Sequence, residues 1–204
     1  MARRMRITKN TPLAVIVIML IITVGQHYSW FNLTEETLPQ VKSAITESEP
    51  GLYRVVQFSD GDTIQIDMNG KTEKVRLLGV DTPETNDPRK SVQCYGQAAS
   101  AFTKQLIGTN SVRIASDPLN ANRDRYSRLL RYVYLPDGTL VNAEIIKQGY
   151  GFAYLNFPFT KSDEFRKHEI AAKEAGKGLW SNCQPAQNKS GGYTSNDASQ
   201  GPSQ

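Results

Sequence analysis

The stretch from Asp60 to Glu84 reads DGDTIQIDMNGKTEKVRLLGVDTPE, and it decides how the rest of the chain is interpreted. β-Branched residues alternate with polar ones on both sides of Asn69-Gly70, a dipeptide that favours a two-residue turn between antiparallel strands. The stretch therefore predicts a β-hairpin with strands over Thr63–Met68 and Lys74–Leu78.

Acidic residues and an arginine stand at the open end of this hairpin. Folding at the turn returns the second strand to the start of the first, so we expect Asp81 and Glu84 to approach Asp62. Carboxylates held close together raise one another's pKa unless a cation neutralises them, and oxygen ligands suit Ca²⁺ or Mg²⁺. Arg76 lies on the same rim, where a guanidinium can grip a phosphate. The hairpin thus indicates metal-assisted phosphodiester chemistry.

The remaining pattern predicts a single α+β domain around a small barrel, because five strands precede or alternate with helices that come late in the chain. The other expected strands are Leu52–Phe58, a short one around Val112 and Ile114, and Leu129–Leu135. The expected helices are Tyr95–Ile107, Val141–Gln148 and Asp163–Ala175.

Three strings together resemble one known family. Asp60-Gly61-Asp62-Thr63, the run RLLGVDTPE at 76–84 and Asp124-Arg125-Tyr126-Ser127-Arg128 closely resemble the staphylococcal nuclease family, over roughly residues 51–183. The resemblance implies an OB-fold, a five-stranded Greek-key barrel with about three packed helices. It also implies a monomeric, Ca²⁺-dependent endonuclease that hydrolyses DNA and RNA and leaves 3′-phosphate ends.

The resemblance assigns the metal and proton-transfer residues. It makes Asp62 and Asp81 metal ligands, with Thr82 contributing through its backbone or a bridging water, and Glu84 the general base that abstracts a proton from water or orients it. An aspartate before Gly or Thr also commonly caps a turn, which is the interpretation we prefer for Asp60. The alternative for Glu84 is a cap of the loop after Pro83.

The same resemblance gives Arg76 and Arg128 the role of binding phosphate oxygens and stabilising the charge of a five-coordinate transition state. Arg128 has two alternatives, a surface arginine at a strand edge or an ion pair with Asp124. Ser127 stands where the family usually has glycine, and because serine resists a positive φ, we expect a reshaped loop.

Substrate contacts are implied for Arg125 and Tyr126, at the terminal phosphate and nucleotide, and for Tyr154, as a ring on which a base stacks. A partly buried core aromatic is the alternative for Tyr154. Asn156 stands where the family commonly has a second tyrosine, so base stacking is expected to be weaker.

Composition limits other chemistries. The chain has 204 residues and a net charge of +4, but four basic residues precede any acidic one, which leaves 20 basic against 20 acidic residues in the remainder. Global charge therefore does not argue for nucleic-acid binding. Two histidines, His27 and His168, and two cysteines provide neither a histidine relay nor a Cys-rich zinc site.

The two ends of the chain differ from the domain. Residues 1–28 join a basic start to an apolar run and are interpreted as a signal peptide or an uncleaved membrane anchor, so the domain is expected outside the cytoplasm, as a secreted, periplasmic or surface-anchored protein. Residues 29–50 are expected to be a linker, residues 51–183 the nuclease domain, and residues 184–204, rich in Ser, Gly, Asn and Gln, a disordered tail.

Cys94 opens the first expected helix and Cys183 follows the last. In an exported protein such a pair favours a disulfide, although two free thiols stay open as the alternative.

Two rivals remain for function. One is a non-catalytic OB-type module that binds nucleic acid or protein, and the other is a membrane-tethered domain with a vestigial site. Both would be expected to lose the acidic and arginine positions. This chain keeps all five of them, namely Asp62, Arg76, Asp81, Glu84 and Arg128.

Overall fold

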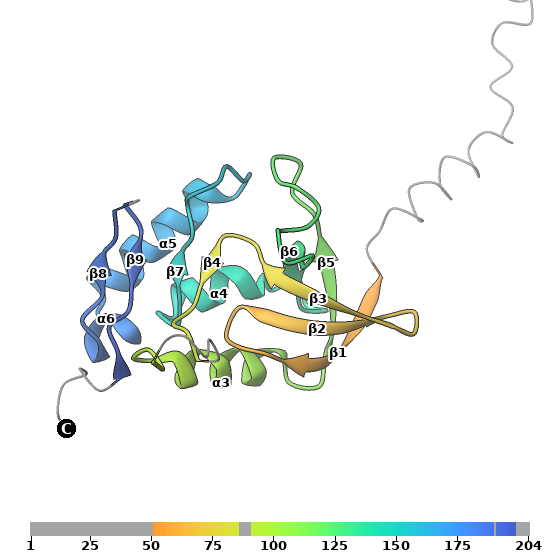
Figure 1. Ribbon diagram of the computed structural model, residues 1–204, viewed down its shortest axis with the longest axis horizontal. Helices are drawn as coiled ribbons and strands as arrows, with labels where there is room; N and C mark the ends of the chain where they lie inside the picture. The colour runs from red at the N-terminus through yellow and green to blue at the C-terminus, as the bar shows by residue number, and fades with distance from the viewer. Residues whose placement is uncertain (1–50, 86–90, 190, 199–204) are drawn as a thin grey trace, which may run out of the picture. The chain divides into compact units, whose positions relative to one another are not determined.

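Five strands close into a barrel in the computed structural model, which describes residues 51–85, 91–189 and 191–198 (Figure 1). The barrel order is β1-β2-β3-β6-β5, and β1 pairs with β5 to close it. All neighbours are antiparallel except β3 and β6. The strands are β1 Leu52–Phe58, β2 Thr63–Met68, β3 Lys71–Leu77, β5 Ser111–Ala115 and β6 Leu129–Tyr134.

In the described residues four helices accompany the barrel, three of them at the positions expected from the sequence. These are α3 Gly96–Ile107, α4 Val141–Lys147, α5 Ser162–Glu174 and the short α6 Leu179–Asn182. Helix α4 is central, because it contacts α3, α5, β4 and β6. The OB-fold α+β architecture is therefore confirmed. None of the helices in the described part of the chain has the length and apolar character needed to cross a membrane.

The predicted hairpin forms between β2 and β3. Asn69 and Gly70 both have positive φ, 56° and 86°, as a two-residue turn of this kind requires. Strand β3 begins at Lys71, three residues before the predicted start, because the tight turn leaves Met68 and Lys71 paired across it. At the open end Thr63 lies opposite Arg76.

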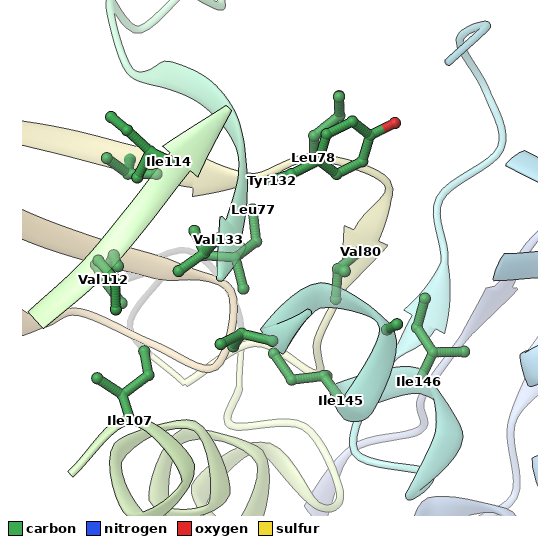
Figure 2. Close-up of a cluster of buried hydrophobic side chains, with 14 of the residues drawn as sticks. Leu77, Leu78, Val80, Ile107, Val112, Ile114, Tyr132, Val133, Ile145 and Ile146 are labelled. Carbon is green, nitrogen blue, oxygen red and sulfur yellow. The ribbon is translucent and has the colours of Figure 1, made fainter. Parts of the chain in front are cut away.

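Alternation along the strands fills the barrel. The β-branched residues Ile64, Ile66 and Val75 are fully buried, and residues from α3 and α4 complete the core. Figure 2 shows this layering, with Ile107 of α3 and Ile145 of α4 below side chains of β5 and β6. Burial of this kind contributes roughly 1.5–3 kcal/mol for each large aliphatic side chain.

A second sheet, missed in the sequence, connects the barrel to the later helices. Strand β4 (Val80–Asp81) pairs antiparallel with β7 (Phe152–Ala153), so Asp81 lies opposite Phe152. Each strand has only two residues, too few for an alternating pattern to be recognisable. The pairing places Tyr154 beside the β3–β4 turn, where its N–H donates to the Gly79 carbonyl at 2.9 Å.

The expectation of a disordered tail after residue 183 is wrong for the described residues. Strands β8 (Ala186–Gln187) and β9 (Tyr193–Thr194) form a small hairpin beside α6, away from the barrel (Figure 1). Tyr193 packs against Phe152 and Trp180, with ring centroids 6.1 and 4.9 Å away. A polar composition hid this anchoring aromatic. The predicted signal or anchor (1–28) and linker (29–50) lie outside the described residues.

Asp117 fastens the loop before β6 to the start of α5. Its buried carboxylate accepts hydrogen bonds from the Leu119 N–H, the Tyr132 hydroxyl and both the N–H and hydroxyl of Thr160. Burial alone would raise the pKa of Asp117, but these donors outweigh it and hold the pKa below its usual value.

The loop carrying Arg125 and Tyr126 contains a tight turn at Ser127. Ser127 adopts φ 62° and its N–H donates to the Asp124 carbonyl at 3.0 Å. The Asp124 carboxylate closes the loop by accepting the N–H groups of Tyr126 and Arg128. Serine thus takes the left-handed conformation itself, at a cost of roughly 1–2 kcal/mol.

We expect Asp117→Asn to lower the free energy of unfolding by about 2–3 kcal/mol at pH 7, because an amide cannot accept this set of donors. Because the pKa of Asp117 is lower in the folded protein than in the unfolded chain, its carboxylate stabilises the fold fully at pH values above the unfolded pKa of ~3.9. This contribution is lost as the pH falls through the folded pKa. The difference between wild type and variant should therefore shrink between pH 7 and pH 3 in urea titrations. Asp163→Asn, at an exposed position in the first turn of α5, provides a control that should change stability far less. An equal deficit at both pH values would contradict this account.

We expect Ser127→Gly to stabilise the protein by roughly 0.5–1 kcal/mol, because removal of the strained Cβ exceeds the added entropy of the unfolded chain. Ser127→Ala retains Cβ and should bring no gain. Guanidinium titration of the three proteins checks this, and equal stability of the Gly and Ala variants would show that the conformation is unstrained.

Candidate active site

Asp62 is the buried anchor at the open end of the hairpin. One carboxylate oxygen, Oδ2, accepts hydrogen bonds from the Thr82 N–H at 2.8 Å and the Thr82 hydroxyl at 3.1 Å. Its Oδ1 accepts the Thr63 hydroxyl at 3.1 Å. A Cβ at Gly61 would come within 2.9 Å of the Thr82 side chain, so glycine permits the close approach.

Arg76 bridges the two aspartates expected to share a metal. Its Nη1 lies 3.0 Å from Asp62 Oδ2 and its Nη2 lies 3.1 Å from Asp81 Oδ1. Nη1 also donates to the Val80 carbonyl at 2.6 Å, and only 14% of the side chain is exposed. Burial alone would lower the pKa of Arg76, but nearby carboxylates, Asp62 first and then Asp81, outweigh it and raise the pKa. The hairpin thus brings both aspartates to one guanidinium.

Asp60 joins the cluster as well as forming the turn for which it was expected. Its Oδ1 accepts the Asp62 N–H at 3.1 Å, as in an Asx turn. Burial, followed by the neighbouring Asp62 carboxylate, raises the pKa of Asp60 to about 7. The rim therefore holds more carboxylates than the single Arg76 can neutralise.

Arg128 reaches the same cluster from the loop before β6. Its Nε donates to Asp124 Oδ2 at 2.7 Å, which is the ion pair considered as an alternative. Its Nη1 lies 3.5 Å from the Thr63 hydroxyl, which in turn bonds Asp62. Asp124 therefore orients a guanidinium whose far end faces the Asp62 site. Thr63 was not among the residues singled out in the sequence.

Exposed aromatic rings flank the guanidinium groups. Tyr126 is 60% exposed, and the guanidinium carbons of Arg125 and Arg128 lie 4.8 and 5.3 Å from its ring centroid. Tyr154 is 37% exposed, and its ring centroid lies 6.0 Å from that of Phe157. Phe157 was overlooked in the sequence, where it follows Asn156 without a recognisable pattern.

Glu84 lies two residues after Thr82 and is held at its backbone. The Glu84 N–H donates to Gln93 Oε1 at 2.7 Å, and the Gln93 N–H donates to the Glu84 carbonyl at 2.9 Å. The Glu84 carboxylate accepts the N–H of Thr85 at 3.0 Å. Gln93 is a third residue, after Thr63 and Phe157, that the sequence did not indicate, because nothing local marks a glutamine that bonds a backbone nine residues away.

The donor chemistry at this rim fits a hard divalent cation. In the described ranges, no group of three or more His, Cys, Asp or Glu is arranged to hold a metal ion. Asp62 and Asp81 nevertheless present carboxylate oxygens around one cation, Arg76, with Asp60 adding charge. Carboxylate and carbonyl oxygens without nitrogen or sulfur donors suit Ca²⁺ or Mg²⁺.

The N-terminal end of α3 is covalently fixed next to this segment. Cys94 and Cys183 form a disulfide with an S–S distance of 2.05 Å across a sequence separation of 89 residues. A Cβ at Gly96 would lie 3.0 Å from the Glu84 carbonyl, so α3 begins directly against the Glu84 backbone.

Comparison with known proteins agrees with this geometry. A family model described as Staphylococcal nuclease homologue matches residues 74–182. The chain is 34% identical over 175 residues to a protein named Thermonuclease from Staphylococcus hyicus, which covers 85% of this chain and 99% of the relative. It is 40% identical over 159 residues to Endonuclease YncB from Bacillus subtilis (strain 168), with 76% of this chain and 73% of the relative covered.

A further relative, Thermonuclease from Staphylococcus intermedius, is 42% identical over 137 residues, with 67% of this chain and 78% of the relative covered. The residues matched by the family model include the second half of β3 from residue 74, all of β4 and the loop that carries Arg128. On the barrel, the site and these similarities together, the chain belongs to the staphylococcal nuclease family.

Proposed function

We propose that this protein is an exported, Ca²⁺-dependent nuclease that hydrolyses phosphodiester bonds of DNA and RNA. The observation that carries the proposal is Arg76, which contacts Asp62 and Asp81 simultaneously at the open end of the hairpin. Relatives named Thermonuclease and Endonuclease support the reaction class.

Arg76 and Arg128 are proposed to bind the non-bridging oxygens of the scissile phosphate. Their guanidinium groups approach the Asp62 cluster from β3 and from the Arg128 loop respectively. Fixed donors aimed at charge that develops during the reaction lower the barrier more than donors that only hold substrate. The two arginines therefore act mainly on the transition state.

Glu84 is proposed as the general base that accepts a proton from the attacking water or orients that water. Two hydrogen bonds with Gln93 hold the Glu84 backbone, which restricts the positions that the carboxylate can take. The family pattern favours cleavage of the bond to the 5′ oxygen, which leaves 3′-phosphate ends.

Asp62, Asp81 and the Thr82 backbone are the residues that would hold Ca²⁺. When bound, the ion would supply positive charge that screens the phosphate and polarises it. Arg125, Tyr126 and Tyr154 are proposed to contact the adjoining phosphate and bases. Both tyrosine rings are exposed, and that of Tyr126 lies beside Arg125 and Arg128.

The proposal includes export of the protein. The nuclease would act as a monomer, and it would contact a membrane only through residues 1–28. The Cys94–Cys183 disulfide supports an extracytoplasmic location, because such bonds persist in oxidising compartments and are rare in the cytosol.

Digestion of plasmid DNA and of RNA by the full chain tests the proposal. We expect cleavage with Ca²⁺ and none after chelation. Glu84→Gln and Arg76→Lys should each lower turnover by about 10²-fold or more, because one removes the base and the other the planar fork of donors. Arg54→Gln provides a matched control, since Arg54 pairs with Asp67 at the surface and its side chain is 70% exposed.

Circular dichroism melting should show that the variants stay folded. Binding of the nucleic acid without cleavage in Ca²⁺ would instead favour a non-catalytic OB-type module. Full activity of the Glu84→Gln protein would remove Glu84 from the role of base.

A further inference from the structure

The described residues that follow Cys183, 184–189 and 191–198, form a segment that we call the strap, and its last residues pair with the chain just after Glu84. Residues 195–198 run antiparallel to residues 92–94, with Gln93 and Asp197 paired as a β-bridge. The Cys94 N–H donates to the Asn196 carbonyl at 2.8 Å, and the Ala198 N–H donates to the Val92 carbonyl at 2.9 Å. These bonds add a short strand to the segment that begins α3.

Ser195 is the buried contact of this strap. Its exposed fraction is 5%, and its hydroxyl donates to the Cys94 carbonyl at 2.9 Å. The Ser195 carbonyl accepts a hydrogen bond from Gln93 Nε2 at 3.2 Å. Ser195 therefore bonds both the Gln93 side chain and the Cys94 backbone.

Gln93 connects the strap to Glu84. Its amide oxygen accepts the Glu84 N–H, its amide nitrogen donates to the Ser195 carbonyl, and its backbone N–H donates to the Glu84 carbonyl. The amide group uses opposite ends for the two contacts, so neither a carboxylate nor an amine could make both. The strap thereby fixes which way the Gln93 amide points, and so which atom it offers to Glu84.

Two further attachments hold the strap in place. The disulfide joins Cys183, just before it, to Cys94, just after Gln93. Tyr193 is held at its ring by Phe152 and Trp180 and at its hydroxyl by Lys173 Nζ, at 2.7 Å.

We propose that the strap, residues 184–189 and 191–198, supports the active site, and that Gln93 is a positioning residue through which the strap fixes the Glu84 backbone. This inference rests on the proposed nuclease function for its kinetic consequence. The positional claim stands on the hydrogen bonds alone, and both can be tested in the full chain.

Gln93→Met keeps the length of the side chain but removes both amide contacts. We expect kcat to fall by about ten- to a hundredfold with little change in KM, because small displacements of a catalytic group cost this much. Gln105→Met, on the exposed face of α3, is the matched control and should leave kcat unchanged.

Ala198→Pro removes the strap's N–H bond to Val92 without touching Gln93 or Glu84. We expect Ala198→Pro to lower kcat, as Gln93→Met does. In both variants hydrogen exchange of the Glu84 amide should be faster than in the wild type. Exchange of the Leu77 amide, which bonds the Asp62 carbonyl, should stay slow. The exchange measurement does not depend on catalysis, so an inactive wild type would overturn the nuclease proposal and leave this test intact.

Unchanged kcat and unchanged Glu84 exchange in both variants would overturn the positioning role. An effect of Gln93→Met alone would overturn the part played by the strap. A lowered melting temperature with kcat preserved well below melting would mean that the strap serves stability only.

A separate observation concerns the surface beyond Tyr126. A cleft of about 500 Å³ lies between β3 and the Arg128 loop, and its lining includes Lys71, Glu73, Lys74, Arg123 and Tyr126. Three of these side chains are cationic and one is acidic. The cleft adjoins Tyr126, the ring that the active-site guanidinium of Arg128 flanks.

The acidic member lies between two of the cations. Lys71 Nζ is 2.6 Å and Arg123 Nη1 is 2.8 Å from the Glu73 carboxylate. Hydrogen bonds from Arg123 and then Lys71 lower the pKa of Glu73 to about 2. Glu73 thus stays charged and holds Lys71 and Arg123 at the cleft, whose lining keeps an excess of cationic over acidic side chains.

We infer that this cleft binds the phosphodiester backbone of a nucleic-acid strand leaving the active site, as an additional subsite. Positive charge beside an exposed aromatic ring is the combination that follows a single strand without sequence preference. The inference deepens the proposed function, and its test uses binding in chelator so that cleavage is not required.

Fluorescence anisotropy with single-stranded oligonucleotides of increasing length, titrated against salt, tests this. We expect Lys74→Gln and Arg123→Gln each to reduce the slope of log K against log salt by about 0.7 for long strands and to leave dinucleotide affinity unchanged. Glu73→Gln should tighten binding of long strands. Arg113→Gln, exposed on β5, is the control. Unaltered slopes in the cleft variants, or equal losses with the dinucleotide, would overturn the subsite.

Discussion

The Asp62 carboxylate is the constraint on which the site depends. It accepts hydrogen bonds from Thr82 on the chain leaving the hairpin and from Thr63 on the strand entering it, and it pairs with Arg76. A buried charge is tolerable only when partners surround it, and removing one partner of such a pair typically costs about 3–5 kcal/mol. Folding the hairpin correctly and assembling the site are therefore the same event.

The rim of the site holds more acidic than basic side chains. Asp60, Asp62 and Asp81 gather around one arginine, and the pKa of Asp60 rises through burial and then through the charge of Asp62. Carboxylates held this close disfavour one another's charged forms, and a bound cation would relieve that repulsion. Proteins accept such local cost where function needs it.

A second constraint comes from far along the chain. The strap, Gln93 and the disulfide connect the C-terminal residues to the Glu84 backbone, and the aromatic contacts of Tyr193 hold them there. The barrel strands and their adjoining loops supply Arg76, Arg128 and Asp62, and the short β4–β7 sheet supplies Asp81. The helical part and the C-terminal residues support Glu84. The site thus lies where two differently built regions meet.

Local sequence determined what depends on neighbours in the chain. The hairpin at Asn69-Gly70, the barrel strands and the long helices follow from alternation, helical spacing and turn chemistry, and the motif strings indicated Asp62, Arg76 and Asp81. Only the tertiary structure decided the contacts of Gln93 with Ser195, 102 residues apart, and of Arg128 with Thr63, 65 apart. A single hydrogen bond between distant residues leaves no periodic trace, and two-residue strands or one anchoring tyrosine in a polar tail are too short to produce one.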